Sequence, residues 1–291
     1  MKFSEAYGRG KFGLSFEIFP PKTPAGEAGL FEAVGQLMVF RPSFVTCTYG
    51  AGGSTREKTL ELTVAIRERF GVSTAAHLTC VGSSHDGLRA WLAVATAQRV
   101  ENIVALRGDP PRGESRFVPA DGGPAHANEL VALIRREFPH FGVAVAGYPE
   151  THQEAISPES DLAYLREKVE TGADVVITQL FYDNRDFFAF RRRYREVRIR
   201  VPLVPGILPI INYSQIQRIT SLCGAKLPPG LVADLEAHRE DPEAEMEVGV
   251  THAIRQCRAL LEAGIPGLHF YVLNKATAPA RILAALDLPP R

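Results

Sequence analysis

Polar residues able to do acid–base chemistry stand inside otherwise apolar stretches of this sequence. Glu17 lies in "LSFEIF", which is followed directly by two prolines. Because proline cannot donate to a sheet ladder, the stretch is typical of a short β-strand that ends there. An unpaired carboxylate beside Phe16 and Ile18 is costly to bury, so Glu17 is either paired with a cation or kept for chemistry. Apolar neighbours would raise the pKa of its carboxyl.

Further polar residues follow most of the other apolar runs. His77 is either a hydrogen-bonded core histidine or a functional group. Arg107 and Asp109 stand two residues apart, share a face of one predicted strand and could form a plain ion pair. The other polar residues near such ends include Thr46, Thr48, Thr79, Tyr148, Glu150, His152, Gln179, Asn212, Tyr213, Tyr271, Asn274 and Lys275. Because nearly every run ends in this way, the pattern favours one shared functional site.

Eight apolar runs must position these residues, and they recur regularly. They begin at residues 14, 44, 73, 102, 142, 174, 202 and 267. Successive runs start 28 to 40 residues apart, except that the last interval has 65 residues. About 30 residues are enough for a strand, a crossover helix and two loops. The repeat predicts an α/β protein, a closed (β/α)₈ TIM barrel forming a single domain over residues 1–291, with functional residues at the carboxyl ends of its strands.

The segments between the runs have helical patterns with recognisable starts. Ser54 and Glu57 have the spacing of a capping box, and either Ser157 or Ser160 can cap a later helix. Asp241 before a proline is a favoured pair at a helix start. The long last interval holds extra helical segments, "YSQIQRITSLCG" and "PGLVADLEAHRE", before the final strand.

An open dinucleotide-binding sheet is the main alternative to the barrel, and the sequence does not support it. The nearest glycine-rich stretch is "GAGGST" at 50–55, where Thr55 stands in place of the last glycine or alanine of the fingerprint. Glu68, the nearest acidic candidate downstream, lies inside a predicted helix rather than at a strand end. We therefore reject this fold.

Composition excludes several classes of protein. Thirty-three basic residues balance 33 acidic ones, so the excess of positive charge typical of nucleic-acid binding is missing. No apolar run approaches a membrane span, and residues 1–13 lack the apolar core of a signal peptide, so we expect a cytoplasmic protein. The four cysteines form no CxxC pair, which makes a disulfide framework or a zinc site a poor interpretation.

Eight motifs together resemble the bacterial methylenetetrahydrofolate reductases. They are "FEIFPPKT", "TYGAGGSTREKT", "HLTC", "LRGDPP", "AGYPETH", "ITQLFYD", "PGILPI" and "HFYVLN", in the family's order along almost the whole chain. The resemblance implies a (β/α)₈ barrel with non-covalently bound FAD. It also implies reduction of 5,10-methylenetetrahydrofolate to 5-methyltetrahydrofolate with NADH or NADPH as donor, in a ping-pong cycle, commonly by a homo-oligomer such as a dimer or tetramer.

The resemblance also assigns roles to residues. It makes Glu17 the general acid and Asp109 a catalytic group near the flavin and the folate. It places the contacts with substrate at Glu17, Asp109, Gln179, Ile219 and Lys275. It places the FAD contacts at Thr48, His77, Arg107, Gly108, Asp109, His126, Ala127, Ala146, Tyr148, His152, Asp161 and Lys168.

Three positions depart from the family pattern. Glu167 precedes Lys168 where an arginine is common at the FAD phosphates, so one phosphate contact is lost or replaced. His126 stands where a tyrosine is common. Ile219 stands where some members have a phenylalanine, and it cannot stack as an aromatic ring does.

Three alternatives stay open at this point. A protein partner could supply electrons in place of NADH or NADPH. A metal-assisted barrel hydrolase or aldolase could use Glu17, His77, Asp109 and His152, although these show no HxH or HxxxH spacing. A non-catalytic folate- or flavin-binding protein could keep the fold, but binding alone does not require an acid such as Glu17.

Overall fold

Parallel strands form the centre of the computed structural model, which describes residues 1–8, 10–49, 55–110, 113–114 and 116–290. Each predicted run forms a strand where expected. The strands are β1 (Gly13–Ile18), β2 (Phe44–Cys47), β3 (Ser73–Thr79), β4 (Asn102–Leu106), β5 (Gly142–Gly147), β6 (Val175–Thr178), β7 (Leu203–Val204), β8 (Gly206–Ile207) and β9 (Gly267–Tyr271). Their order is β7-β6-β5-β4-β3-β2-β1-β9-β8, so neighbours in the sequence are neighbours in the sheet.

The barrel closes through the seventh predicted run, which is split in two. β7 pairs with β6 on one side, and β8 pairs with β9 on the other. Only Pro205 separates β7 from β8, and its carbonyl accepts a hydrogen bond from the backbone nitrogen of His269 at 3.1 Å. Because proline has no N–H to give to the ladder, the run is interrupted there without losing its place in the ring. The predicted eight-stranded barrel is confirmed, with one strand in two pieces.

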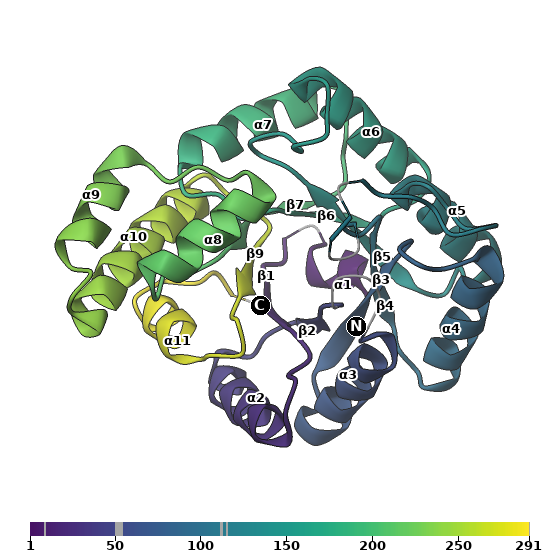
Figure 1. Ribbon diagram of the computed structural model, residues 1–291, viewed down its shortest axis with the longest axis horizontal. Coiled ribbons are helices and arrows are strands. Elements are labelled where there is room, and N and C mark those ends of the chain that lie inside the picture. The colour runs from purple at the N-terminus through teal and green to yellow at the C-terminus, as the bar shows by residue number, and fades with distance from the viewer. Residues whose placement is uncertain (9, 50–54, 111–112, 115, 291) are drawn as a thin grey trace.

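Helices surround the strands on the outside of the ring (Figure 1). They are α2 (Pro24–Leu37), α3 (Arg56–Phe70), α4 (His85–Ala97), α5 (Ala127–Glu137), α6 (Pro158–Glu170), α7 (Asn184–Glu196), α8 (Tyr213–Cys223), α9 (Pro229–Ala237), α10 (Pro242–Glu262) and α11 (Thr277–Ala284), with a short 3₁₀ turn at Met38–Phe40. The predicted extra helices before the last strand are confirmed as α8 and α9. Within the residues that the structure describes, no helix has the length and apolar character needed to cross a membrane.

Two of the predicted helix starts are confirmed in atomic detail. The Ser157 side chain accepts the backbone N–H of Ser160 at the start of α6, so Ser157 is the cap. The Asp241 side chain accepts two backbone N–H groups at the start of α10. The predicted cap at Ser54 lies outside the described residues, and α3 begins at Arg56.

A short N-terminal helix that the sequence patterns did not predict, α1 (Phe3–Ala6), lies inside the ring of strands (Figure 1). Phe3 and Tyr7 pack edge-on against Phe44, with ring centroids 4.9 and 5.7 Å apart. They join a cluster of inward-facing residues that includes Ala75, Val104, Ala144 and Val175, at or near the starts of the strands. The helix therefore plugs the amino-terminal end of the barrel.

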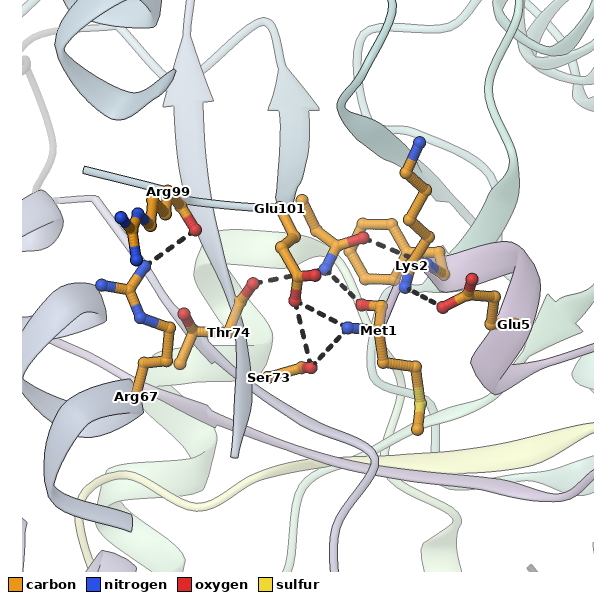
Figure 2. Close-up of polar contacts among 10 residues, drawn as sticks. Met1, Lys2, Glu5, Arg67, Ser73, Thr74, Arg99 and Glu101 are labelled. Atoms are coloured by element: carbon orange, nitrogen blue, oxygen red, sulfur yellow. Dashed lines mark hydrogen bonds and ion pairs between the residues drawn. The ribbon is translucent and has the colours of Figure 1, made fainter. Parts of the chain in front are cut away.

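Polar contacts hold this plug to the ends of β3 and β4 (Figure 2). The terminal amine of Met1 donates to Ser73 Oγ at 2.7 Å and to Glu101 Oε2 at 2.6 Å. Fully buried Asn102 accepts the Phe3 backbone N–H at 3.0 Å and donates to the Met1 carbonyl at 2.9 Å. One buried amide thus provides the hydrogen-bond partner of both a backbone N–H and a backbone carbonyl of the plug, as buried polar groups require.

Replacement of Asn102 by alanine should lower the free energy of unfolding by roughly 2–4 kcal/mol, because the buried Phe3 N–H would lose its acceptor. Urea unfolding followed by circular dichroism measures the change. Gln36→Ala is the control, since the Gln36 amide contacts only Glu32 at an exposed surface, and should shift stability by less than about 0.5 kcal/mol. Equal stabilities for the two variants would contradict the role given to Asn102.

Candidate active site

A cavity of about 830 Å³ opens at the carboxyl ends of the strands. Its volume lies in the range of sites that enclose a large ligand. Most of the residues assigned to the site from the sequence line it, from β1 to β6 and from α5 and α6. They are Glu17, Thr48, His77, Arg107, Gly108, Asp109, His126, Ala127, Ala146, Tyr148, His152, Asp161, Lys168 and Gln179. The structure therefore brings together residues that are up to 162 positions apart in the sequence.

Two of the predicted substrate contacts lie elsewhere. Ile219, on α8, packs against an apolar cluster that includes Leu180 and Tyr182. Lys275 lines a second cavity of about 310 Å³, which shares only Tyr271 with the main one. Neither residue lines the main cavity, so their contacts with substrate stay predictions.

Glu17 lies at the floor of the cavity, on the inner side of β1. Side chains alternate along a strand, so Phe16 and Ile18 point outward into the helix layer while Glu17 points inward. Its side chain is 16% exposed. Oε2 is 3.2 Å from His269 Nε2 and 3.3 Å from His77 Nε2, so two imidazoles flank one carboxylate oxygen.

The electrostatic setting of Glu17 differs from the sequence prediction. Burial alone would raise its pKa, but the charge of His77 and the hydrogen bonds from His269 and His77 outweigh burial and lower the pKa to about 2. The expectation of a raised pKa was wrong because it considered burial and did not include the two histidine partners. His269 was missed as its partner, although it stands two residues before Tyr271 and so shares the inward face of β9.

The segment after β4 forms one wall. Arg107 makes two parallel hydrogen bonds to Glu154, at 2.5 and 2.8 Å, and not to Asp109, so the proposed ion pair within the strand was wrong. Asp109 is exposed to the cavity. Gly108 has φ +88°, and a Cβ there would lie 2.6 Å from Val81 Cγ2, so only glycine fits this turn. Glu154 was not among the predicted site residues.

The adjacent wall comes from β5 and α6, since β5 pairs with β4. The rings of Tyr148 and His152 pack edge-on at 4.7 Å, and Asp161 accepts the backbone N–H of His152. Burial, helped by the charge of Arg107, lowers the pKa of His152. Lys168 donates to the Ala146 carbonyl at 2.8 Å, and burial lowers its pKa to about 8.

Glu167 precedes Lys168 on α6 and is held in place by a partner on the preceding helix, α5. Its carboxylate accepts a hydrogen bond of 2.8 Å from the Asn128 amide. Both side chains line the cavity. Glu167 therefore adds a negative charge to the cavity wall one residue before Lys168, whose ammonium also interacts with the charge of Asp161.

Gln179 and Tyr271 complete the floor. The Gln179 side-chain oxygen accepts the backbone N–H of Leu180 at 2.9 Å, and Tyr271 donates to the Thr178 carbonyl at 2.7 Å. Both orientations are thus set by backbone atoms of the β6 end. In the part of the chain that the structure describes, no group of three or more His, Cys, Asp or Glu side chains is arranged to hold a metal ion.

A family model for methylenetetrahydrofolate reductase matches residues 2–287. The chain belongs to the methylenetetrahydrofolate reductase family. It is 35% identical to 5,10-methylenetetrahydrofolate reductase of Escherichia coli (strain K12), over 97% of this chain and 93% of that protein. It is 40% identical to methylenetetrahydrofolate reductase (NADH) 1 of Zea mays over 99% of its own length. The chain spans only about half the length of that maize relative.

Solved structures agree on the fold of this reductase family member. A Clostridium thermocellum protein described as binding two copies of 5-methyl-5,6,7,8-tetrahydrofolic acid superposes with a TM-score of 0.64. The match covers 98% of this chain and 97% of that one, at 13% identity. At this identity the likeness supports the barrel fold alone.

The low pKa of Glu17 predicts acid sensitivity in this reductase family member. A carboxyl whose pKa is lowered on folding stabilises the protein above its unfolded value of 4.5, and this contribution is lost as the pH falls towards about 2. The loss amounts to about 2 kcal/mol between pH 6 and pH 3. Urea unfolding at both pH values should show the wild type losing about 2 kcal/mol more than Glu17→Gln. Equal losses in the two proteins would mean that the histidines do not hold Glu17 as a carboxylate.

Proposed function

We propose that this protein catalyses the reduction of 5,10-methylenetetrahydrofolate to 5-methyltetrahydrofolate, with bound FAD and with NADH or NADPH as electron donor. Family membership supports the reaction class. The observation that carries the proposal is the position of Glu17 on the floor of the large cavity that Asp109 and Gln179 also line. A protein that only binds folate needs no such acid.

The residues of the cavity fit FAD. The half-buried Lys168 ammonium is bonded to a carbonyl and would gain from an anionic pyrophosphate. His77 also lines the cavity, with its Nε2 facing Glu17 at 3.3 Å. Gly108 keeps the strand-end backbone free of a side chain, and Asp161 can accept from ribose hydroxyls. When bound, the flavin would pass on a hydride taken from the nicotinamide.

Glu17 would supply the proton that the reaction requires. Opening the imidazolidine ring of the substrate requires protonation of a departing nitrogen, which exposes an electrophilic carbon to hydride. With its low pKa, Glu17 is ionised in the open cavity, and the proton for the reaction would reach it from His77, whose Nε2 lies 3.3 Å from its Oε2. Filling the cavity removes water, which disfavours the charged pair relative to the neutral one. The proton would then move to Glu17, where it can be given to substrate.

Asp109 and Gln179 would orient the folate. An ionised carboxylate accepts hydrogen bonds from a pterin, and the Gln179 amide can pair with the donor and acceptor edge of the same ring. We expect the nicotinamide and the folate to use the cavity in turn, because both must approach the same reacting centre. That the protein is a single domain and cytoplasmic stays a prediction from the sequence pattern and composition, and that it is a homo-oligomer stays a prediction from the family resemblance.

The absorbance spectrum of the purified protein tests this function. Flavin bands should bleach anaerobically with NADH or NADPH and return on addition of methylenetetrahydrofolate. Glu17→Gln should keep the flavin and the bleaching but slow the return by roughly 10²–10⁴-fold. Glu247→Gln, a change on the exposed face of α10, is the control and should behave as wild type.

Each other outcome of this test has a distinct meaning. Bands that ignore both nicotinamides would identify a protein partner as donor. A protein that takes up no flavin after incubation with FAD would refute the proposed function, and unchanged turnover in Glu17→Gln would refute the role of Glu17.

Glu167 is expected to weaken the binding of the FAD phosphates. Glu167→Arg replaces a negative charge beside Lys168 with a positive one, so the dissociation constant of FAD should fall several-fold. Quenching of flavin fluorescence during titration of the flavin-free protein measures it. Glu170→Arg makes the same charge change on α6 at a residue that does not line the cavity and should have a much smaller effect. Equal effects would assign the change to net charge alone.

A further inference from the structure

A column of buried polar side chains runs along the barrel interior from the N-terminal plug to Glu17. Tyr7 Oη lies 3.0 Å from Ser15 Oγ, and Ser15 Oγ lies 2.8 Å from His269 Nδ1. His269 Nε2 then lies 3.2 Å from Glu17 Oε2. Ser15 and His269 are completely buried, and Tyr7 is 2% exposed. Only the Glu17 end of the column meets the cavity.

The barrel is shaped to admit this column. Ser15 and His269 are partners in the register of β1 and β9. Gly13 and Gly267, two residues earlier on each strand, are partners on the same inward face. A Cβ at Gly13 would lie 2.4 Å from Tyr7 Cε1, and one at Gly267 would lie 2.5 Å from the same atom. Two facing glycines thus make the space for the phenol ring, which enters from a different segment of the chain.

The direction of the hydrogen bonds follows from the group at each end. Ionised Glu17 can only accept, so His269 Nε2 carries the hydrogen. Burial raises the pKa of Tyr7, which keeps the phenol protonated as a donor. Tyr7 therefore donates to Ser15, and Ser15 donates to His269 Nδ1. The column fixes one tautomer of His269, as a partner on the second ring nitrogen does for a functional imidazole.

The column positions groups and does not conduct protons to bulk water. The end of the column away from Glu17 is the Tyr7 phenol, whose ring packs edge-on against Phe44 where the N-terminal plug closes the barrel. A proton that moved from Glu17 along the column towards Tyr7 would reach no solvent there. Both histidine contacts also go to Oε2 of Glu17, and so leave Oε1 as the oxygen for exchange with a ligand in the cavity.

We propose that Tyr7 and Ser15 are positioning residues for the proton transfer by Glu17, acting through the tautomer of His269. This inference rests on the proposed function of Glu17 as the acid. Without the Ser15 donor, His269 would carry its hydrogen on Nδ1 in part of the molecules. Its Nε2 lone pair would then face Glu17 and favour the protonated carboxyl. The titratable groups near Glu17 among the described residues are His77, His269, Tyr271 and Cys47.

Tyr7→Phe and Ser15→Ala test the column in the flavin-loaded full chain, with stopped-flow measurement of both half-reactions across pH. Loss of one orienting hydrogen bond, worth about 0.5–1.5 kcal/mol, should slow reoxidation by methylenetetrahydrofolate roughly two- to tenfold. The midpoint of its pH profile should rise, while reduction by NADH or NADPH stays unchanged. Tyr194→Phe is the matched control, because its buried phenol donates only to the Val201 carbonyl, on the outside of the barrel.

Nitrogen-15 NMR of labelled histidine in the flavin-free chain gives a readout independent of activity. The His269 signal, identified by its loss in His269→Asn, should show the Nε2–H tautomer in wild type and a mixture in Ser15→Ala, which removes the donor to Nδ1. A wild-type enzyme that is not reoxidised by the folate would refute the proposed function, while NMR still tests the column. An active wild type together with a Ser15→Ala variant that has unchanged tautomer, rate and pH profile would overturn the inference.

Discussion

The structure of the site depends on how a carboxylate is kept inside a barrel. Burying Glu17 alone would cost several kcal/mol, and the two histidines on β3 and β9 offset that cost. Removal of either imidazole would leave a charge underneath the cavity with one partner. The inward face of the barrel at this depth is therefore polar by necessity, and each residue there must find a partner within the ring.

The interior of the barrel changes character with depth, and this separates stability from chemistry. At the amino-terminal ends of the strands the inward residues are apolar and are closed off by α1, with Asn102 bonding the plug to the wall. One layer higher lie Ser15 and His269, and above them Glu17 faces the cavity. In barrels of this kind the carboxyl ends carry function and the amino ends carry stability. The polar column links these two layers directly.

The sequence could predict what depends on local pattern. Eight apolar runs at regular spacing were enough for the barrel, and strand ends were enough to place Glu17, Asp109 and Gln179 in one cavity. The pKa of Glu17 could not be predicted, because its partners come from strands 60 and 252 residues away and only the closed ring brings them together. The plug was missed for a similar reason, since four residues of helix carry no detectable period. Pro205 interrupts the seventh apolar run, and the structure shows that this divides the strand into β7 and β8 without opening the barrel.

Two of the three positions that depart from the family pattern, His126 and Glu167, line the cavity, whereas Ile219 lies outside it. Proton transfer and phosphate binding make different physical demands on a site. Proton transfer requires a carboxyl held to within a fraction of an ångström, so Glu17 on β1 has partners on two other strands, β3 and β9. Binding of a phosphate depends on charge summed over several groups, and one group can substitute for another. Arg107 is already neutralised by Glu154, and Glu167 is bonded to Asn128. Most of the local attraction for an anion therefore falls to Lys168, whose ammonium is the more available because its nearest partner is an uncharged carbonyl.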